Sequence, residues 1–277
     1  MWAAEPTEGI AMASPIDTVV LLGAMRAEME ILKPFVTMGE ERSVQGTRFL
    51  LGQIGGTPVA LAWAGVGKVN AAMTTTLSLC SFGVRAVVLA GVAGATDPDL
   101  VPGDIILGEE VGHHDFGMVN EQGFTAWQTW NPLSGEKNPP FFAASAELVQ
   151  VGMARAEGLA LDEVVEGLKR LPTVRAGRIG TGDIVAATPA KRRELFERYG
   201  VQACEMEGAG VAQVCHQHAV PWLVIRGITD TADYIPSDFE AVARRVTGQV
   251  AAFTTGLVAD LAGRDQGGER PRGEALL

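Results

Sequence analysis

The most informative part of the chain is the stretch Ala203-Cys204-Glu205-Met206-Glu207-Gly208-Ala209, which is followed by Pro221-Trp222-Leu223-Val224-Ile225-Arg226-Gly227-Ile228-Thr229-Asp230. Between the two, residues 207–218 carry apolar side chains at helical spacing, and residues 223–225 form an apolar run typical of a buried strand. The pattern therefore places two carboxylates just before a helix and a third at the end of a buried strand. Polar side chains at such a place are candidates for a functional site.

The same alternation of strand and helix patterns runs through the rest of the chain. Apolar runs, and the hairpin signal Gly55-Gly56, predict strands over residues 18–22, 48–54, 58–64, 86–90, 104–107, 175–179 and 223–225. Helical patterns cover residues 27–32, 68–81, 145–157, 190–199, 207–218 and 238–261. This alternation predicts an α/β sandwich in which helices cover a central sheet.

The 277 residues are enough for one large α/β domain, and we expect that domain to span residues 17–262. Residues 1–16 have neither a basic segment nor a long apolar run, so we expect a flexible extension rather than a signal peptide. Residues 263–277 are rich in Gly, Arg and Glu, which favours a disordered tail. No apolar run reaches membrane-spanning length, and we therefore expect a cytoplasmic protein with no membrane partner.

The formal net charge of -11 opposes binding to nucleic-acid phosphates. The same charge is also typical of a solvated surface with no partner at all. The three cysteines, Cys80, Cys204 and Cys215, form no disulfide or metal-binding pattern, which fits a reducing compartment. The adjacent His113 and His114 lack the spacing of a zinc helix. We therefore expect no metal and no other cofactor.

Glu28 lies in the first turn of the predicted helix over residues 27–32. The helix dipole stabilises a carboxylate there, which would be reason enough for its presence. The alternative is that Glu28 is a general base that activates a water molecule. Glu30 carries the same group but faces another way on the helix.

Asp230 follows Arg226 and Thr229 at the end of an apolar strand. A carboxylic acid placed there can protonate a leaving group such as a purine base. Asp233 is the nearby rival, and its simpler interpretation is a helix or turn cap.

Glu205 and Glu207 flank Met206 and precede a Gly-Ala-Gly segment that lets a ligand approach the backbone closely. A carboxylate accepts two hydrogen bonds from a vicinal diol, so this motif suits a sugar. Glu205 taken alone could instead face solvent.

Three further segments are candidates for loops around a site. Residues 65–70, Gly-Val-Gly-Lys-Val-Asn, open the helix over 68–81 and suit an anion, although a tight turn explains the glycines as well. Gly91-Val92-Ala93-Gly94 closes the strand over 86–90 as a turn at the carboxyl edge of the sheet, where α/β sheets bind ligands. Residues 113–140 show no clear period, which is typical of a functional loop or of a disordered segment.

Together these motifs resemble those of the nucleoside phosphorylase and nucleosidase family, and within it most those of the 5′-methylthioadenosine/S-adenosylhomocysteine nucleosidases. The resemblance covers residues 19–261. It rests on the following segments: Gly23-Ala24-Met25-x-x-Glu28, Gly65-Val66-Gly67-Lys68-Val69-Asn70-Ala71-Ala72, Gly103-Asp104-Ile105, Glu205-Met206-Glu207 and Arg226-x-x-Thr229-Asp230. It implies a single-domain, three-layer α/β sandwich in which helices flank a mixed central β-sheet.

The resemblance also implies a hydrolase that cleaves the N-glycosidic bond of a 5′-substituted adenine nucleoside with water. Glu28 would orient and deprotonate the water with help from Arg226. Asp230, steadied by Thr229, would protonate N7 of the adenine. No cofactor is implied.

The implied substrate-binding residues surround these groups. Met206 would lie against the ribose, and Glu207 would bind its 2′- and 3′-hydroxyls. The full set is Glu205, Met206, Glu207, Thr229, Val92, Ala93, Gly94, Asp183, Ile184, Val185 and Phe116. Phe116 belongs to the segment 113–140, which in the family often covers the 5′ substituent from a neighbouring subunit. Small apolar residues over 68–81 favour a homodimer built on that helix.

The chain departs from the family pattern at three places. Val92 stands where the family has a hydroxyl residue, Val185 stands where an aromatic residue often stacks on the base, and the segment 113–140 is longer. These departures leave the 5′ substituent open.

Three alternatives remain. A purine nucleoside phosphorylase should have arginines converging on the glycine-rich segments, and none falls within 65–70 or 91–94. Futalosine and aminodeoxyfutalosine hydrolases are also similar to the chain around residues 65–72, 91–95 and 115–124. An acid at Asp230 favours adenine over hypoxanthine as the leaving base. Of these two substrates, only aminodeoxyfutalosine, an adenine nucleoside, then remains possible. A non-catalytic nucleoside-binding protein would not need Glu28.

Overall fold

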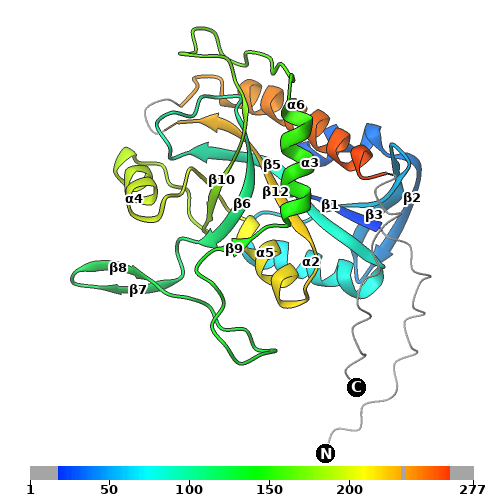
Figure 1. Ribbon diagram of the computed structural model, residues 1–277, viewed down its shortest axis with the longest axis horizontal. Helices are drawn as coiled ribbons and strands as arrows, with labels where there is room; N and C mark the ends of the chain where they lie inside the picture. The colour runs from blue at the N-terminus through cyan, green and yellow to red at the C-terminus, as the bar shows by residue number, and fades with distance from the viewer. Residues whose placement is uncertain (1–17, 232–234, 263–277) are drawn as a thin grey trace, which may run out of the picture.

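Figure 1 shows the computed structural model, which describes residues 18–231 and 235–262. At its centre lies a ten-stranded sheet in the order β11-β10-β6-β12-β5-β1-β4-β3-β2, with β9 paired to β6. The strands are β1 (Thr18–Gly23), β2 (Thr37–Val44), β3 (Thr47–Ile54), β4 (Thr57–Trp63), β5 (Val84–Ala95), β6 (Ile105–His113), β9 (Phe142–Ala143), β10 (Val174–Thr181), β11 (Ala203–Glu205) and β12 (Trp222–Asp230). A separate hairpin consists of β7 (Gly117–Asn120) and β8 (Gly123–Ala126).

The helices are α1 (Arg26–Leu32), α2 (Lys68–Ser81), α3 (Ala146–Ala156), α4 (Pro189–Tyr199), α5 (Gly208–Gln217) and α6 (Phe239–Asp260), with a short 3₁₀ turn, η1 (Lys33–Phe35). The predicted helices are confirmed, with shifts of at most one residue at their ends. Among the described residues, none of the helices is long and apolar enough to cross a membrane. The predicted extension over 1–16, the predicted tail over 263–277 and Asp233 lie outside the described residues.

The central strands β1, β5 and β12 run parallel to one another, whereas β12 pairs antiparallel with β6. The sheet is therefore mixed, as predicted. All residues of β1 and β12 are buried, because helices cover both faces of the sheet at this place. Such strands have continuous apolar runs rather than alternating ones, which is why they stand out in the sequence.

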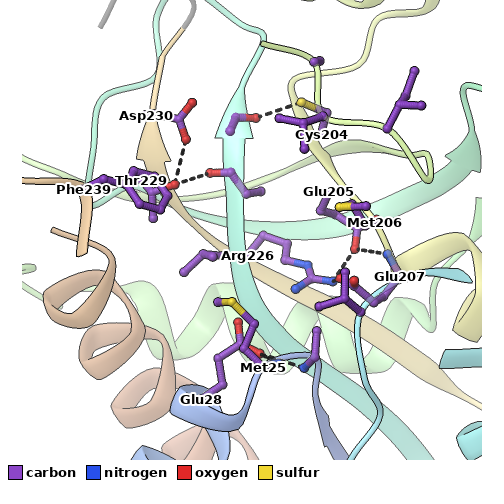
Figure 2. Close-up of a pocket in the computed structure, with 18 of the residues that line it drawn as sticks. Met25, Glu28, Cys204, Glu205, Met206, Glu207, Arg226, Thr229, Asp230 and Phe239 are labelled. Atoms are coloured by element: carbon purple, nitrogen blue, oxygen red, sulfur yellow. Dashed lines mark hydrogen bonds and ion pairs between the residues drawn. The ribbon is translucent and has the colours of Figure 1, made fainter. Parts of the chain in front are cut away.

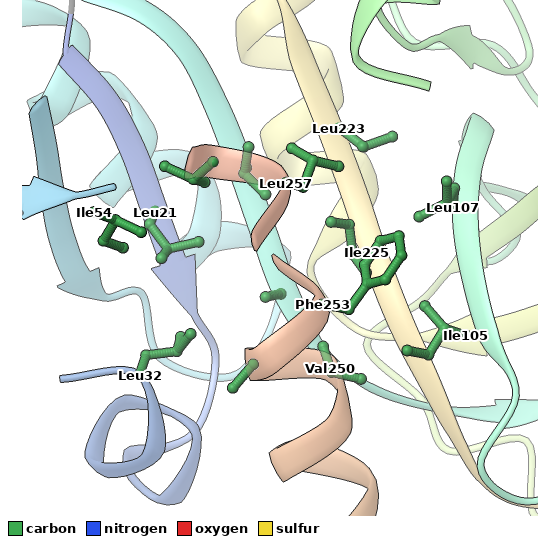
Figure 3. Close-up of a cluster of buried hydrophobic side chains, with 14 of the residues drawn as sticks. Leu21, Leu32, Ile54, Ile105, Leu107, Leu223, Ile225, Val250, Phe253 and Leu257 are labelled. Atoms are coloured by element: carbon green, nitrogen blue, oxygen red, sulfur yellow. The ribbon is translucent and has the colours of Figure 1, made fainter. Parts of the chain in front are cut away.

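Alternate side chains of a strand point to opposite faces of the sheet, so each face has its own core. Val19 and Leu21 belong to a core that includes side chains of α1, α3 and α6; Figure 3 shows Phe253 of α6 packed in this core beside β12. Val20 and Leu22 belong to the opposite core, which includes side chains of α2 and α5. The result is a sheet between two helical layers, the three-layer sandwich expected from the sequence.

The prediction for Gly91-Val92-Ala93-Gly94 was wrong in one respect: this segment is not a turn but part of β5, which continues to Ala95. Gly94 pairs with Asp230 of β12 on one side and with Cys204 of β11 on the other. Because two strands accompany β5 beyond its apolar run, the small residues remain in the sheet. Polar side chains at the ends of the neighbouring strands β11 and β12 lie next to these small residues.

Several strands escaped prediction because their sequences lack the expected pattern. β2 is exposed along nearly its whole length, and β11 has only three residues. The hairpin β7–β8 lies within the segment 113–140, which we had expected to be an irregular loop, and Figure 1 shows it projecting from the body of the molecule. β2 and the hairpin β7–β8 depend on strand pairing rather than on burial of an apolar face, whereas β11 is buried but too short to show a pattern.

The turn between β4 and α2 uses glycine for a conformational reason. Gly65 and Gly67 have φ values of +83° and +96°, which other residues rarely adopt. The tight-turn interpretation of residues 65–70 is therefore correct. Gly210 in α5 has a different role, since a Cβ there would lie 2.5 Å from the carbonyl oxygen of Lys68. This glycine lets α5 approach the start of α2.

We expect Gly210→Ala to destabilise the fold by about 1–3 kcal/mol, because the added methyl group meets backbone that cannot move aside. Gly248→Ala in α6 is a matched control: apart from the adjoining backbone of α6, no atom of the described residues lies within 4 Å of its added Cβ, and alanine favours a helix over glycine by up to about 1 kcal/mol. Urea denaturation of both variants measures the difference. Equal effects of the two substitutions would contradict the close approach of α5 to α2.

Candidate active site

A cavity of about 320 Å³ opens at the carboxyl ends of the parallel strands β1, β5 and β12, the usual ligand site of α/β sheets. Its lining residues include Ala24, Met25, Glu28, Val66, Val92, Ala93, Gly94, Ile184, Val185, Ala186, Arg192, Cys204, Glu205, Met206, Glu207, Arg226, Thr229, Asp230 and Phe239. Figure 2 shows Glu28 and Asp230 at opposite ends of this cavity, with Arg226 between them. The two acids singled out in the sequence thus face one space.

Glu28 is positioned by the start of α1. Its Oε2 accepts hydrogen bonds from the backbone N–H groups of Ala24 (2.7 Å) and Met25 (2.8 Å). Its Oε1 is buried and has no hydrogen-bond partner among the described residues. A Cβ on Gly91 would lie 2.7 Å from this oxygen and closer still to Nη1 of Arg226. One oxygen of Glu28 therefore caps α1. The other oxygen, Oε1, lies above Gly91 together with Nη1 of Arg226.

Burial raises the pKa of Glu28 above its ordinary value, and the positive charge of Arg226 only partly offsets this effect. A carboxylate with a raised pKa holds a proton more readily, which suits a general base. Glu30 is exposed and pairs with Lys33 at 3.3 Å, so it faces away from the cavity as predicted.

Arg226 is the centre of the buried charges. It is 1% exposed, and its Nη2 forms ion pairs with Glu205 and, at 3.0 Å, with Oε2 of Glu207. Burial lowers the pKa of Arg226, but Glu205, Glu207 and Glu28 together outweigh burial and raise it. The guanidinium therefore stays charged.

Glu205 faces the interior, so the solvent-facing alternative was wrong. Its side chain accepts hydrogen bonds from the hydroxyl of Thr181, from the N–H of Glu207 (2.9 Å) and from the N–H of Gly208 (2.8 Å to Oε2), in addition to its ion pair with Arg226. These partners hold the start of α5 and compensate the buried charge.

Glu207 is more open to the cavity. Its Oε1 accepts a hydrogen bond from the N–H of Gly67 at 2.9 Å, and its Oε2 pairs with Arg226. Burial raises its pKa, with Arg226 acting in the opposite direction. Met206 lines the cavity beside it.

Asp230 uses both carboxylate oxygens in this structure. Oδ1 accepts the hydroxyl hydrogen of Thr229 at 2.8 Å, and Oδ2 forms an ion pair with Nη2 of Arg192. Arg192 was not predicted, because it lies in a charged helix beside Arg193 and nothing in the sequence distinguishes the two. Only the fold reveals that one points into the cavity.

The remaining predicted residues divide into two groups. Val92, Ala93, Gly94, Ile184 and Val185 line the cavity. Two others do not line it. Asp183 follows β10, and its Oδ1 accepts the N–H of Lys68, the first residue of α2, at 2.9 Å. Phe116 is 40% exposed and lies at the base of the β7–β8 hairpin. Phe239, at the start of α6, lines the cavity and was not predicted.

His113 and His114 lie at the end of β6 and just beyond it. His113 Nε2 is 3.0 Å from the side-chain oxygen of Gln213, and His114 is buried. Burial lowers the pKa of both histidines, which favours their neutral forms. Residues 18–231 and 235–262 contain no group of three or more His, Cys, Asp or Glu side chains placed to hold a metal ion.

The cavity carries an excess of acidic groups. Among the described residues, four carboxyl side chains line it (Glu28, Glu205, Glu207 and Asp230) against two guanidinium groups (Arg192 and Arg226), a difference of two. Both arginines are already paired with carboxylates. Such a lining attracts a cation rather than an anion.

The chain belongs to the phosphorylase superfamily, whose family model matches residues 18–259. Among curated relatives, it is similar to the 5′-methylthioadenosine/S-adenosylhomocysteine nucleosidase of Mycobacterium bovis, with 33% identity over 85% of this chain and 92% of that protein. Among solved structures, it is similar to the nucleosidase of that name from Neisseria meningitidis in complex with methylthio-immucillin-A, with a TM-score of 0.74 and 28% identity over 88% of this chain and 100% of that chain. Futalosine hydrolase of Helicobacter pylori is similar too, with a TM-score of 0.72 and 28% identity over 89% and 99% of the two chains.

The raised pKa of Glu28 leads to a prediction about the free energy of unfolding. The native state binds this proton more tightly than the unfolded chain, so the ionised group destabilises the fold as the pH rises above about 4.5. Glu28→Gln keeps an oxygen for the N–H groups of Ala24 and Met25 and removes the charge. It should raise the free energy of unfolding at pH 7, by about 1.4 kcal/mol for each unit by which the pKa is raised.

Urea denaturation between pH 4 and pH 8 measures this effect, and the gain should disappear towards pH 4. The exposed Glu30→Gln is the control and should change stability little at any pH. A Glu28→Gln variant that is less stable than the wild type at pH 7 would show that Arg226 outweighs the burial of Glu28.

Proposed function

We propose that the protein is a purine nucleosidase that hydrolyses the N-glycosidic bond of 5′-methylthioadenosine and S-adenosylhomocysteine, releasing adenine and the 5′-thioribose. The observation that carries the proposal is a single cavity with Glu28 at one end, Asp230 at the other and an excess of carboxylates between them. The curated relatives with this name match most of the chain.

Bond cleavage requires help for the leaving group. The bond between C1′ and N9 breaks, and adenine departs with the electron pair. In the proposed mechanism Asp230 gives its proton to N7 as this charge develops, and Thr229 holds the other carboxylate oxygen. Proton transfer of this kind typically contributes a factor of about 10²–10⁴ to the rate.

The ribose becomes a cation that is shared between C1′ and the ring oxygen. The carboxylates around Arg226 stabilise that charge, because they are fixed and shielded from bulk water. Glu207 would accept hydrogen bonds from the 2′- and 3′-hydroxyls, with Met206 against the sugar ring. A water molecule held by Glu28 Oε1 and Arg226 Nη1 then adds to C1′ and gives its proton to Glu28.

The cavity favours hydrolysis over phosphorolysis. A phosphate ion would need free cations, and both arginines that line the cavity are paired with carboxylates. Glu28 would also repel an anion at the position proposed for the water. A non-catalytic binding protein is disfavoured too, since binding alone does not require a buried carboxylate with an unpaired oxygen.

The second candidate substrate is aminodeoxyfutalosine, also a 5′-substituted adenine nucleoside. It is favoured by the likeness to futalosine hydrolase, while the acid at Asp230 supports adenine rather than hypoxanthine as the leaving base. The segment around Phe116 would decide between the two 5′ substituents.

We expect the purified protein to release adenine from methylthioadenosine at the same rate with and without phosphate. A panel that also contains S-adenosylhomocysteine, adenosine, inosine, futalosine and aminodeoxyfutalosine, with the free base separated by chromatography, measures substrate choice. Strict dependence on phosphate would contradict hydrolysis. Preference for futalosine over methylthioadenosine would contradict the adenine assignment.

The proposal includes a homodimer in the cytoplasm, a role in methionine salvage, and no nucleic-acid or membrane partner. Support for the dimer comes from exposed apolar side chains beside the cavity: Trp63 (55%), Val66 (49%), Val69 (77%) and Met73 (51%). Val66 also lines the cavity, so a partner on this surface would lie next to the substrate. The partner's copy of Phe116 is the candidate for covering the 5′ substituent.

Light scattering of the wild type should give twice the chain mass. Val69→Glu combined with Met73→Glu should shift the mass towards the monomer and raise KM for methylthioadenosine. Leu159→Glu combined with Leu171→Glu adds the same charge at exposed positions (43% and 67%) away from α2, from the cavity and from the hairpin β7–β8, and serves as the comparison. A wild-type monomer with full activity would contradict a shared cavity.

A further inference from the structure

Three charged residues beside the cavity have no part in the proposed steps of hydrolysis: Lys68, Asp115 and Asp183. Lys68 is the first residue of α2, Asp115 lies between β6 and β7, and Asp183 follows β10. None of the three lines the cavity, although Asp183 was predicted to bind the substrate. The fold thus brings together three side chains from segments that are far apart in the sequence.

The contacts among these residues form a closed network. Nζ of Lys68 lies 2.5 Å from Oδ1 of Asp115 and 3.6 Å from Oδ2 of Asp183. The backbone N–H of Lys68 donates to Oδ1 of Asp183 at 2.9 Å, and the N–H of Asp183 donates to Oδ2 of Asp115 at 2.7 Å. Each pair among the three residues is therefore joined by at least one polar contact.

Partial burial makes this network stronger than an exposed ion pair. The side chains of Lys68 and Asp115 are 18% and 15% exposed, so water and salt screen their charges less than at an open surface. Burial raises the pKa of Asp115, but Lys68 and the N–H of Asp183 outweigh burial and lower this pKa. Asp115 therefore pairs with Lys68 as a carboxylate at neutral pH.

The network fixes the turn that holds Glu207. Gly67 lies just before Lys68, and its N–H donates to Oε1 of Glu207 at 2.9 Å. A Cβ on Gly67 would lie 3.2 Å from Oδ1 of Asp183, so Asp183 packs against the same turn. The other oxygen of Glu207 pairs with Arg226. The orientation of the Glu207 carboxylate therefore depends on where the network places the N–H of Gly67.

We propose that Lys68 is a positioning residue that acts through Glu207 on recognition of the ribose. Its ion pairs with Asp115 and Asp183 hold the turn in place. The N–H of Gly67 in this turn fixes the orientation of the Glu207 carboxylate, which accepts hydrogen bonds from the 2′- and 3′-hydroxyls. This inference rests on the proposed nucleosidase function, in which Glu207 binds the two hydroxyls.

The readout must separate the ribose from the base. Asp183 lies just before Ile184, whose side chain lines the cavity, so loss of the network would disturb contacts to the base as well. Two substrates that share the base and the 5′ substituent and differ only at C2′ isolate the effect on the ribose. Their intrinsic difference in reactivity cancels when a variant is compared with the wild type.

The test compares 5′-methylthioadenosine with its 2′-deoxy analogue, and it uses the full chain. The ratio of the two kcat/KM values measures how strongly the protein uses the 2′-hydroxyl. In Lys68→Met this ratio should fall about five- to tenfold, which is part of the factor of about 10–100 that a hydrogen bond to a charged group contributes. Lys68→Arg keeps the cation and should lower the ratio less.

A double-mutant cycle tests whether Lys68 acts through Glu207. Glu207→Ala should lower the ratio by itself, and adding Lys68→Met should then lower it little further. Full additivity of the two effects would overturn the inference. Lys33→Met is the matched control, because it removes an exposed lysine that pairs with Glu30 at 3.3 Å away from the cavity. It should leave the ratio unchanged.

A Lys68→Met variant that is slower on both substrates with an unchanged ratio would show that the network is merely structural and would overturn the inference. If Lys68→Met does not fold, Asp115→Asn weakens the same network and provides the readout, and the ratio should again fall. An unchanged ratio in that variant would overturn the inference as well. Failure of the wild type to release adenine from any nucleoside would contradict the proposed function instead.

Discussion

The structure of the site depends on one buried cation, the guanidinium of Arg226. It is enclosed in the sheet sandwich and faces Glu205, Glu207 and Glu28. Burying charge is costly unless each charge has a partner and each polar atom a hydrogen bond. Here the carboxylates supply the partners, and backbone N–H groups at the starts of α1, α2 and α5 supply the hydrogen bonds. Removal of the guanidinium would leave several buried acids uncompensated.

This constraint explains why small residues stand where the strands approach one another. A Cβ on Gly91 would collide with Arg226 and Glu28, and a Cβ on Gly208 would lie 2.9 Å from Oε1 of Glu205. It also explains the raised pKa values of Glu28 and Glu207, whose burial is only partly offset by the shared cation. Burial of these carboxylates thus lowers the stability of the fold. In the proposed mechanism, their fixed negative charge stabilises a cationic transition state.

The sequence contained enough to predict the alternation of the fold, because continuous apolar runs mark strands buried on both faces. It also predicted Glu28 and Asp230 as site candidates, and the fold brings both to one cavity because Glu28 lies just after β1 and Asp230 ends β12 at the same edge of the sheet. Arg192 and the inward direction of Glu205 could not be predicted. Both depend on contacts between segments far apart in the chain. Arg192 does not differ in type from the exposed Arg193 beside it, and nothing in the sequence around Glu205 shows which way its side chain points. The extension of β5 through Gly94 was missed for the same reason, because pairing with β11 and β12 is not a local property.

The helix N-termini connect the architecture to the choice of nucleophile. In many α/β proteins these N–H groups bind phosphate, and the segment 65–70 resembles such a site in sequence. In this chain carboxylates already occupy the corresponding donors. Glu28 accepts from Ala24 and Met25, Glu207 accepts from Gly67, and Asp183 accepts from Lys68. A phosphate would have to displace the carboxylate that is hydrogen-bonded at the start of each helix. A neutral water molecule can instead bind to Oε1 of Glu28, which has no hydrogen-bond partner among the described residues. In the proposed mechanism the carboxylates that hold the helices in place therefore also favour water over phosphate.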